Sequence, residues 1–130
     1  MQKSHASDSQ LPLIFAEVKS LLLPYSKILQ ARVDTNTRYE LWSNKPVVID
    51  GRSKKDMFFA SIIIQKGYVG FYFMPVYAEK EILDLFPQDL LQLLKGKSCF
   101  HIKEHNKVIL KQIGTALKTG FKMYKQRGWV

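Results

Sequence analysis

Two apolar segments in the middle of the chain constrain the fold more than any other feature of the sequence. Residues 57–64 and 68–77 are apolar on both alternating faces, which is typical of strands inside a packed sheet. The three residues 65–67 between them suit a tight turn, because Gly67 can take a positive φ without steric cost. We therefore expect a central β-hairpin whose second strand is ended by Pro75.

Apolar spacing, proline and glycine predict the elements around this hairpin. A helix is expected to begin at Leu11, with Pro12 in its first turn, and to stop at Pro24. The expected elements, in chain order, are a helix at 11–22, strands at 29–33 and 38–42 around a turn at 34–37, an irregular or edge segment at 44–56, the hairpin, short helices at 79–85 and 87–94, a strand at 98–103 and a helix at 106–126.

These elements predict an α+β fold. We expect an antiparallel sheet of roughly five strands, with an N-terminal helix, short helices and a long C-terminal helix packed on it. A chain of 130 residues is the size of one domain, and its apolar content is too high for a disordered protein. We expect a single domain over residues 1–130, of which residues 1–10 are disordered.

Aromatic residues are dense in the predicted sheet, and strand alternation must send some of them to each face. One interpretation is that helices cover both faces and all these rings are core. The other is that one face forms a pocket wall, with basic residues of the 44–56 segment at its rim as anion anchors. On the second interpretation, the candidate ligand-binding residues are Tyr39, Trp42, Arg52, Lys54, Lys55 and Tyr72.

The C-terminal helix carries five of the chain's twenty basic residues on one side. At about 100° per residue they fall within one narrow arc, away from the apolar stripe. Such a row could contact a phosphate backbone or an acidic partner, although surface helices ordinarily carry lysine on their wet side. The row consists of Lys107, Lys111, Lys118, Lys122 and Lys125.

Composition narrows the classes of function. The formal net charge of +9 favours anionic partners such as nucleic acid or acidic proteins. A single cysteine allows no intramolecular disulfide, and the start of the chain lacks the pattern of a signal peptide. No apolar run approaches the length of a membrane span, so we expect a cytoplasmic protein.

Catalytic and metal-binding motifs are absent from the sequence. It has no nucleophile elbow, no Walker loop and no dinucleotide-binding fingerprint, which favours binding over catalysis and predicts no cofactor. Cys99, His101 and His105 are of ligand type, but their spacing matches no metal motif, and we expect no metal there. The alternative is that Cys99 is a buried small side chain and the histidines lie at the surface.

Three short strings of residues resemble the YdhG-like family of small bacterial domains. They are Met57-Phe58-Phe59-Ala60, Gly70-Phe71-Tyr72 and Cys99-Phe100-His101-Ile102, followed by a long basic C-terminal helix. The resemblance implies a helix followed by an antiparallel sheet with helices packed on it, and, for some members, frataxin-like iron handling. In frataxins that role depends on an acidic ridge along the first helix, where this chain has only Glu17, with Asp8 upstream.

Together these observations predict a non-enzymatic binding or adaptor domain. Its aromatic sheet face and adjacent basic segment would receive a small anionic ligand or an acidic protein. Nonspecific nucleic-acid binding through the C-terminal helix is the first alternative, and frataxin-like iron handling is the second.

Overall fold

The computed structural model describes residues 2–130, and it describes side chains from residue 10 onward. The fold is α+β, as predicted. The helices are α1 (Gln2–Leu22), α2 (Met74–Ala78), α3 (Gln88–Leu91) and α4 (Lys107–Gln126), with 3-10 helices η1 (Leu23–Lys27) and η2 (Lys80–Leu85). The strands are β1 (Gln30–Asp34), β2 (Arg38–Ser43), β3 (Val47–Ile49), β4 (Arg52–Lys54), β5 (Met57–Gln65), β6 (Tyr68–Phe73), β7 (Leu94–Lys95) and β8 (Cys99–Ile102).

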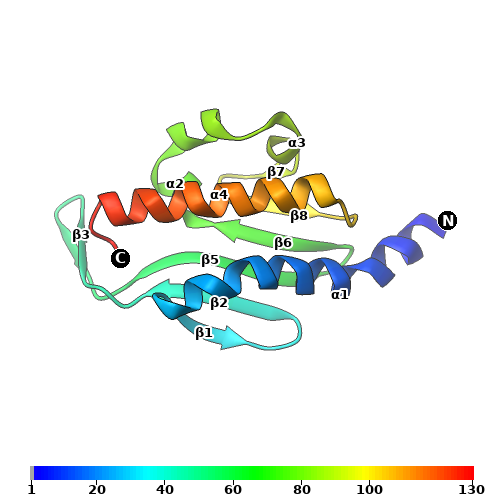
Figure 1. The fold of residues 1–130 in the computed structure, drawn as a ribbon, viewed down its shortest axis with the longest axis horizontal. Helices are drawn as coiled ribbons and strands as arrows, with labels where there is room; N and C mark the ends of the chain where they lie inside the picture. The colour runs from blue at the N-terminus through cyan, green and yellow to red at the C-terminus, as the bar shows by residue number, and fades with distance from the viewer. Residues whose placement is uncertain (1) are drawn as a thin grey trace.

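Six strands form one antiparallel sheet in the order β1-β2-β5-β6-β8-β7 (Figure 1). The predicted hairpin β5–β6 lies at its centre, as its two apolar faces require. The sixth strand, β7, was expected to be the end of a helix over residues 87–94. Gly96, at φ 74°, instead turns the chain so that Leu94 pairs with Phe100 of β8.

Two predicted boundaries differ markedly from the observed ones. Helix α1 begins at Gln2 rather than at Leu11, so Pro12 lies inside the helix and not in its first turn. Strand β6 ends at Phe73, and Pro75 lies at the start of α2, where its missing N–H costs nothing. The expected disorder of residues 1–10 stays a prediction, because Met1 and the side chains of residues 2–9 lie outside the described part.

Segment 44–56 is more ordered than the predicted irregular connection. It folds as a separate two-stranded hairpin of β3 and β4, which projects at the end of the sheet near the C-terminus (Figure 1). Asp50 and Gly51 both have positive φ, 52° and 77°, as the two central residues of a type I′ turn do.

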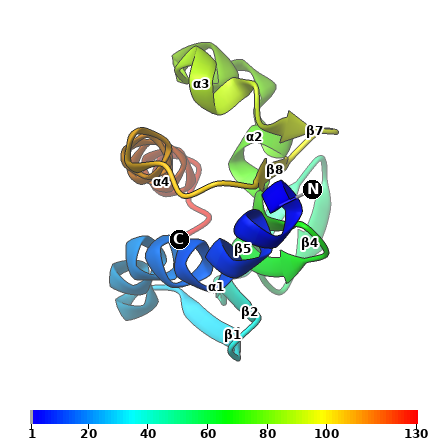
Figure 2. The same cartoon turned by 90° about the vertical axis from the view of Figure 1, so that its right-hand side faces the viewer.

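Both long helices pack on the same face of the six-stranded sheet (Figure 2). The core lies between this face and the helices, and it contains fully buried rings such as Phe59, Phe71 and Tyr124. Gly120 allows α4 to approach the end of β6 closely, since a Cβ there would lie 2.5 Å from Phe73 Cζ. We call the opposite face of the sheet, on which neither long helix packs, the uncovered face.

Candidate functional site

The uncovered face is rich in half-buried aromatic side chains. Alternation along the strands sends four aromatic residues to this face: Trp42 of β2, Phe58 of β5, and Tyr68 and Tyr72 of β6. Their neighbours along the strands are buried beneath the helices, namely Leu41, Phe59, Val69 and Phe71. The prediction that aromatic residues divide between the two faces is confirmed. Helices do not cover both faces, as one of the two interpretations required.

A β-bulge sets which aromatic residue of β5 lies on the uncovered face. Leu41 pairs with Ala60, but Trp42 pairs with Phe58, so Phe59 is the extra residue of β5. Phe59 can therefore enter the core while Phe58 stays beside Trp42, with ring centroids 5.3 Å apart. At the same point the hydroxyl of Tyr124, from α4, donates a hydrogen bond to the Phe58 carbonyl oxygen.

Two adjoining hollows form the candidate site, which we call the Trp42 groove. One is a cleft of about 560 Å³ beside the β3–β4 hairpin, and the other is an open hollow of about 440 Å³ on the sheet. They share Trp42, Phe58 and Met74. The cleft is also lined by Ile49, Asp50, Lys54, Asp56, Met57, Tyr77, Ala78, Arg127 and Trp129, and the open hollow by Arg38, Glu40, Ser61, Ile63 and Tyr72.

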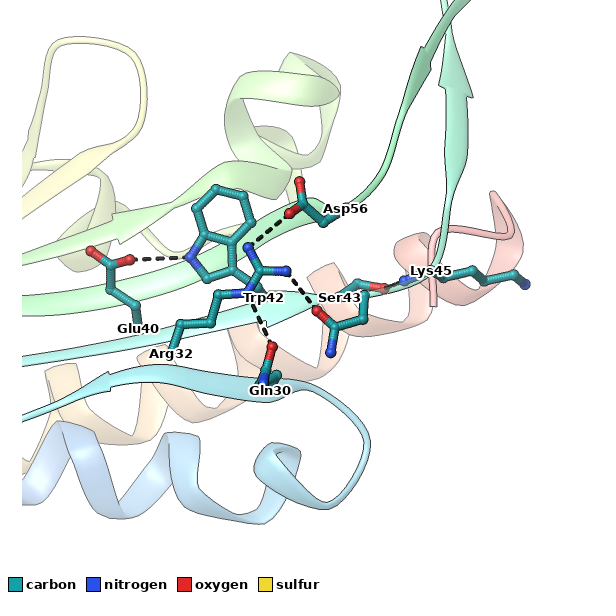
Figure 3. A network of polar contacts seen from close by, with 8 residues as sticks. Gln30, Arg32, Glu40, Trp42, Ser43, Lys45 and Asp56 are labelled. Carbon is teal, nitrogen blue, oxygen red and sulfur yellow. Dashed lines mark hydrogen bonds and ion pairs between the residues drawn. The ribbon is translucent and has the colours of Figure 1, made fainter.

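Hydrogen bonds and ion pairs hold Trp42 in place (Figure 3). Its indole Nε1–H donates to Glu40 Oε1 at 3.1 Å, and the Arg32 guanidinium lies 4.7 Å from the centre of its ring. Arg32 also donates to Asp56 Oδ2 at 2.8 Å and to Asn44 Oδ1 at 2.6 Å. Trp42 is thus fixed between β1, β2 and the start of β5, which suits a rigid binding wall.

The carboxylates around Trp42 are already engaged. Arg38 Nε donates to Glu40 Oε2 at 2.8 Å. Burial alone would raise the pKa of Glu40, but the hydrogen bonds from Trp42 and Arg38 outweigh it and lower the pKa. Asp56 is paired with Arg32. Both carboxylates are therefore engaged in holding the wall together.

The predicted ligand-binding residues do not all lie together. Trp42 and Lys54 line the cleft and Tyr72 lines the adjoining hollow, whereas Arg52 and Lys55 are exposed on and beside β4, outside the lining. Tyr39 lies apart from them all. It is fully buried on the opposite face, with Lys19 Nζ of α1 5.1 Å from its ring centre. Residues 39 and 42 are an odd number of positions apart on one strand, which sends them to opposite faces.

Several groove residues were not predicted as site residues. Phe58 lies in the groove because it is paired opposite Trp42. The bulge sets this register, and no local sequence pattern indicates it. Tyr77 and Trp129 reach the cleft from α2 and the C-terminus, so only tertiary structure brings them there. The Asp50-Gly51 pair could have indicated the hairpin, because Asp-Gly between short apolar and polar runs is typical of a type I′ turn.

The lysine row of α4 lies on the solvent side of that helix. All five lysines are exposed, opposite the buried stripe that contains Ile113, Leu117 and Tyr124. Within the described residues, no carboxylate lies at ion-pair distance from any of the five. Lys125 Nζ lies 5.7 Å from the ring centre of Phe121. The row is thus separate from the Trp42 groove, on the other side of the sheet.

The three residues of metal-ligand type near β8 do not converge. Cys99 is buried on β8, opposite Tyr72 of β6, and burial raises the pKa of its thiol. His105 Nε2 instead lies 3.3 Å from Glu17 Oε1 of α1. Among the residues that the structure describes, no three His, Cys, Asp or Glu side chains come together as a metal site. Iron handling stays a prediction of the family resemblance.

Comparisons with known proteins give no match to a family model, a curated protein or a solved structure. The resemblance to the YdhG-like family therefore stays a prediction. In the described part of the chain, no helix has the length and apolar character needed to cross a membrane. The class that the fold and site define is an α+β domain with a helix-covered face and an aromatic, grooved, uncovered face.

Proposed function

We propose that this protein is a non-enzymatic binding domain whose Trp42 groove receives a small, flat organic anion. Flat rings are suited to the aromatic walls, since Trp42 and Phe58 offer ring surfaces against which a planar ligand can stack. The combined hollows are within the size range of small-molecule sites. The engaged state of Glu40 and Asp56 supports binding rather than proton transfer.

The observation that carries the anionic part of the proposal is the position of Lys54. It lines the aromatic cleft, and among the described residues no carboxylate pairs with it. The other basic groups near the groove are neutralised, Arg32 by Asp56 and Arg127 by Glu79. Asp50 lies in the same lining, so the two acids and two bases of the cleft cancel in formal charge, and the positive excess nearby comes from Arg52 and Lys55 outside the lining.

Intrinsic fluorescence tests this proposal directly, because the only two tryptophans of the chain, Trp42 and Trp129, both line the cleft. The probes are adenosine monophosphate and benzoate, each compared with its uncharged counterpart, adenosine or benzamide. We expect at least one anion to change the emission with saturation, and its uncharged counterpart to bind more weakly.

A lysine pair supplies the matched variants. Lys54→Gln should weaken binding of the anion about tenfold, since a hydrogen bond to a charged group contributes about 1.5–3 kcal/mol. Lys66→Gln removes the same charge from the exposed turn at the far end of β5 and should leave binding unchanged. No response to either anion, or equal losses in the two variants, would refute the groove as an anion site. Saturable binding of poly-glutamate without any response to the small anions would favour an acidic protein partner instead.

A second candidate function is nonspecific binding of double-stranded nucleic acid by the lysine row. The observation that favours it is five exposed, unneutralised lysines along one side of α4, spread over about 27 Å at 1.5 Å per residue. Contacts of ammonium groups with phosphates release counterions, so the logarithm of the affinity should fall with the logarithm of the salt concentration with a slope of roughly −4.5 if all five lysines take part.

The triple variant Lys111→Gln, Lys118→Gln, Lys122→Gln tests this candidate on a short DNA duplex. It should bind more weakly and with a shallower salt slope than the wild type. A control triple variant, Lys27→Gln, Lys66→Gln, Lys80→Gln, removes the same charge from exposed positions outside α4. Equal effects of the two triple variants would show that net charge alone, and not the row, attracts the duplex.

A further inference from the structure

A second aromatic platform lies on the uncovered face beyond the Trp42 groove. The rings of Tyr68 on β6 and His101 on β8 are stacked, with centroids 3.9 Å apart and planes 14° from parallel. Tyr68 and Tyr72 lean over Gly70 from either side, since a Cβ on that glycine would lie 3.5 Å and 3.1 Å from their rings. Gly70 thus leaves room for both rings to lie across β6.

Unneutralised cations flank this platform. Lys95 of β7 and Lys103 after β8 are exposed, and neither has an ion-pair partner within the described residues. Burial and then these two lysines lower the pKa of His101, which places their positive potential at the platform. The two lysines and His101 also line a hollow of about 350 Å³ at the edge of the sheet, where Glu104 is the only acid. Asn106 and Ile109 at the start of α4 also belong to its lining.

The charges and rings together form a pattern across four strands. Aromatic side chains run from Trp42 on β2, past Phe58 and Tyr72, to Tyr68 and His101, and lysines lie at both ends, Lys54 at one and Lys95 and Lys103 at the other. Strands about 4.8 Å apart separate Trp42 from His101 by roughly 14 Å across the sheet. Trp42 is opposite Phe58 and His101 is level with Ile63, which adds roughly 15 Å along the strands. The path is therefore roughly 20 Å long, and it suits a ligand with several flat rings and more than one negative charge.

We propose that the uncovered face binds single-stranded nucleic acid, with one base in the Trp42 groove, a second on the Tyr68–His101 platform, and backbone phosphates near Lys95 and Lys103. Antiparallel sheets with exposed aromatic residues bind single strands in this way, because unpaired bases offer their faces for stacking. A duplex keeps those faces covered and would gain little from this surface. The inference rests on the proposed function for the first base and adds the second base and the phosphates.

The test is fluorescence anisotropy with a labelled oligothymidine of about 12 nucleotides, a length within the usual range of single-strand sites. The oligonucleotide should bind at least tenfold more tightly than thymidine monophosphate and more tightly than a duplex of the same length. Tyr68→Leu should weaken oligonucleotide binding about fivefold or more, as removal of one stacking ring does, and should leave binding of the monophosphate unchanged.

Two double variants of equal charge decide where the strand lies. Lys95→Gln with Lys103→Gln should weaken oligonucleotide binding about tenfold, while Lys118→Gln with Lys122→Gln on α4 should change it less than twofold. All four lysines are exposed, so folding should be unaffected and a thermal melt verifies it. Equal or larger loss from the α4 pair would overturn the inference. An affinity for the monophosphate equal to or higher than that for the oligonucleotide would also overturn the inference. That result would leave the proposed function intact. Absence of binding by both probes would count against both.

Discussion

The two faces of the six-stranded sheet have opposite chemistry, although the same strands build both. The helix-covered face holds fully buried rings such as Phe59 and Phe73, packed edge to face with a centroid distance of 5.6 Å. The uncovered face holds half-buried rings mixed with paired charges, such as Arg38 with Glu40. Paired charges are not expected in an apolar core. A face in contact only with solvent would not require a tryptophan held in one orientation, as Trp42 is. On the proposed function, one face stabilises the fold and the other serves for recognition.

The neighbours Phe58 and Phe59 give the sharpest test of this comparison. Phe59→Ala should lower the free energy of unfolding by about 3–5 kcal/mol, because it empties a fully buried position. Phe58→Ala should lower it by only about 1 kcal/mol, since that ring is half-buried, yet it should impair ligand binding. Urea unfolding measures both values. Similar losses of stability would mean that the uncovered face belongs to the core.

The bulge that separates these two residues can be tested from the other side of the sheet. Tyr124→Phe removes only the hydroxyl that donates to the Phe58 carbonyl, and should lower the free energy of unfolding by about 1–3 kcal/mol. Burial raises the pKa of Tyr124, so the group stays a neutral donor at all ordinary pH values. If the variant unfolds at the same urea concentration as the wild type, the hydroxyl does not stabilise the bulge.

The smallest expected effect is a pH dependence at the Tyr68–His101 platform. The folded-state pKa of His101 lies below its unfolded value of about 6.5, so below that pH the unfolded chain takes up a proton before the folded one does. Stability should therefore be greatest above about pH 6.5 and should fall slightly as the pH drops toward the folded pKa.

Salt and substitution separate the causes of this shift. His101→Gln should remove the slope, and Lys95→Gln should raise the pKa of His101, followed by NMR titration of its ring. High salt should act in the same direction by screening the lysines. A His101 pKa at or above its unfolded value would show that the lysines do not reach the platform.

The sequence predicted the fold well where local patterns decide the structure. The hairpin β5–β6 and α4 follow from apolar periodicity, and Asn106 caps α4 by accepting from the N–H groups of Val108 and Ile109, where the predicted helix begins. Strand β7 escaped prediction because two residues carry no period, and only pairing with β8 makes them a strand.

The candidate site was predicted only in part. Aromatic density identified Trp42 and Tyr72, and charge identified Lys54, but Tyr39 was grouped with them although strand alternation sends it to the opposite face. Phe58 depends on a bulge, whose position is set by packing across the sheet rather than by local sequence. Trp129 is distant in sequence, and its backbone oxygen is held by the Ser43 hydroxyl at 2.6 Å.

The most direct test of the central claim, that the uncovered face and not the lysine row holds the ligand, is an NMR titration with adenosine monophosphate. The chain gives two indole N–H signals, which Trp129→Phe distinguishes. We predict that the Trp42 indole signal and the Lys54 amide shift with a common saturation curve, while the amides of Lys111, Lys118 and Lys122 stay in place. Shifts confined to the α4 lysines, with Trp42 unmoved, would contradict the account.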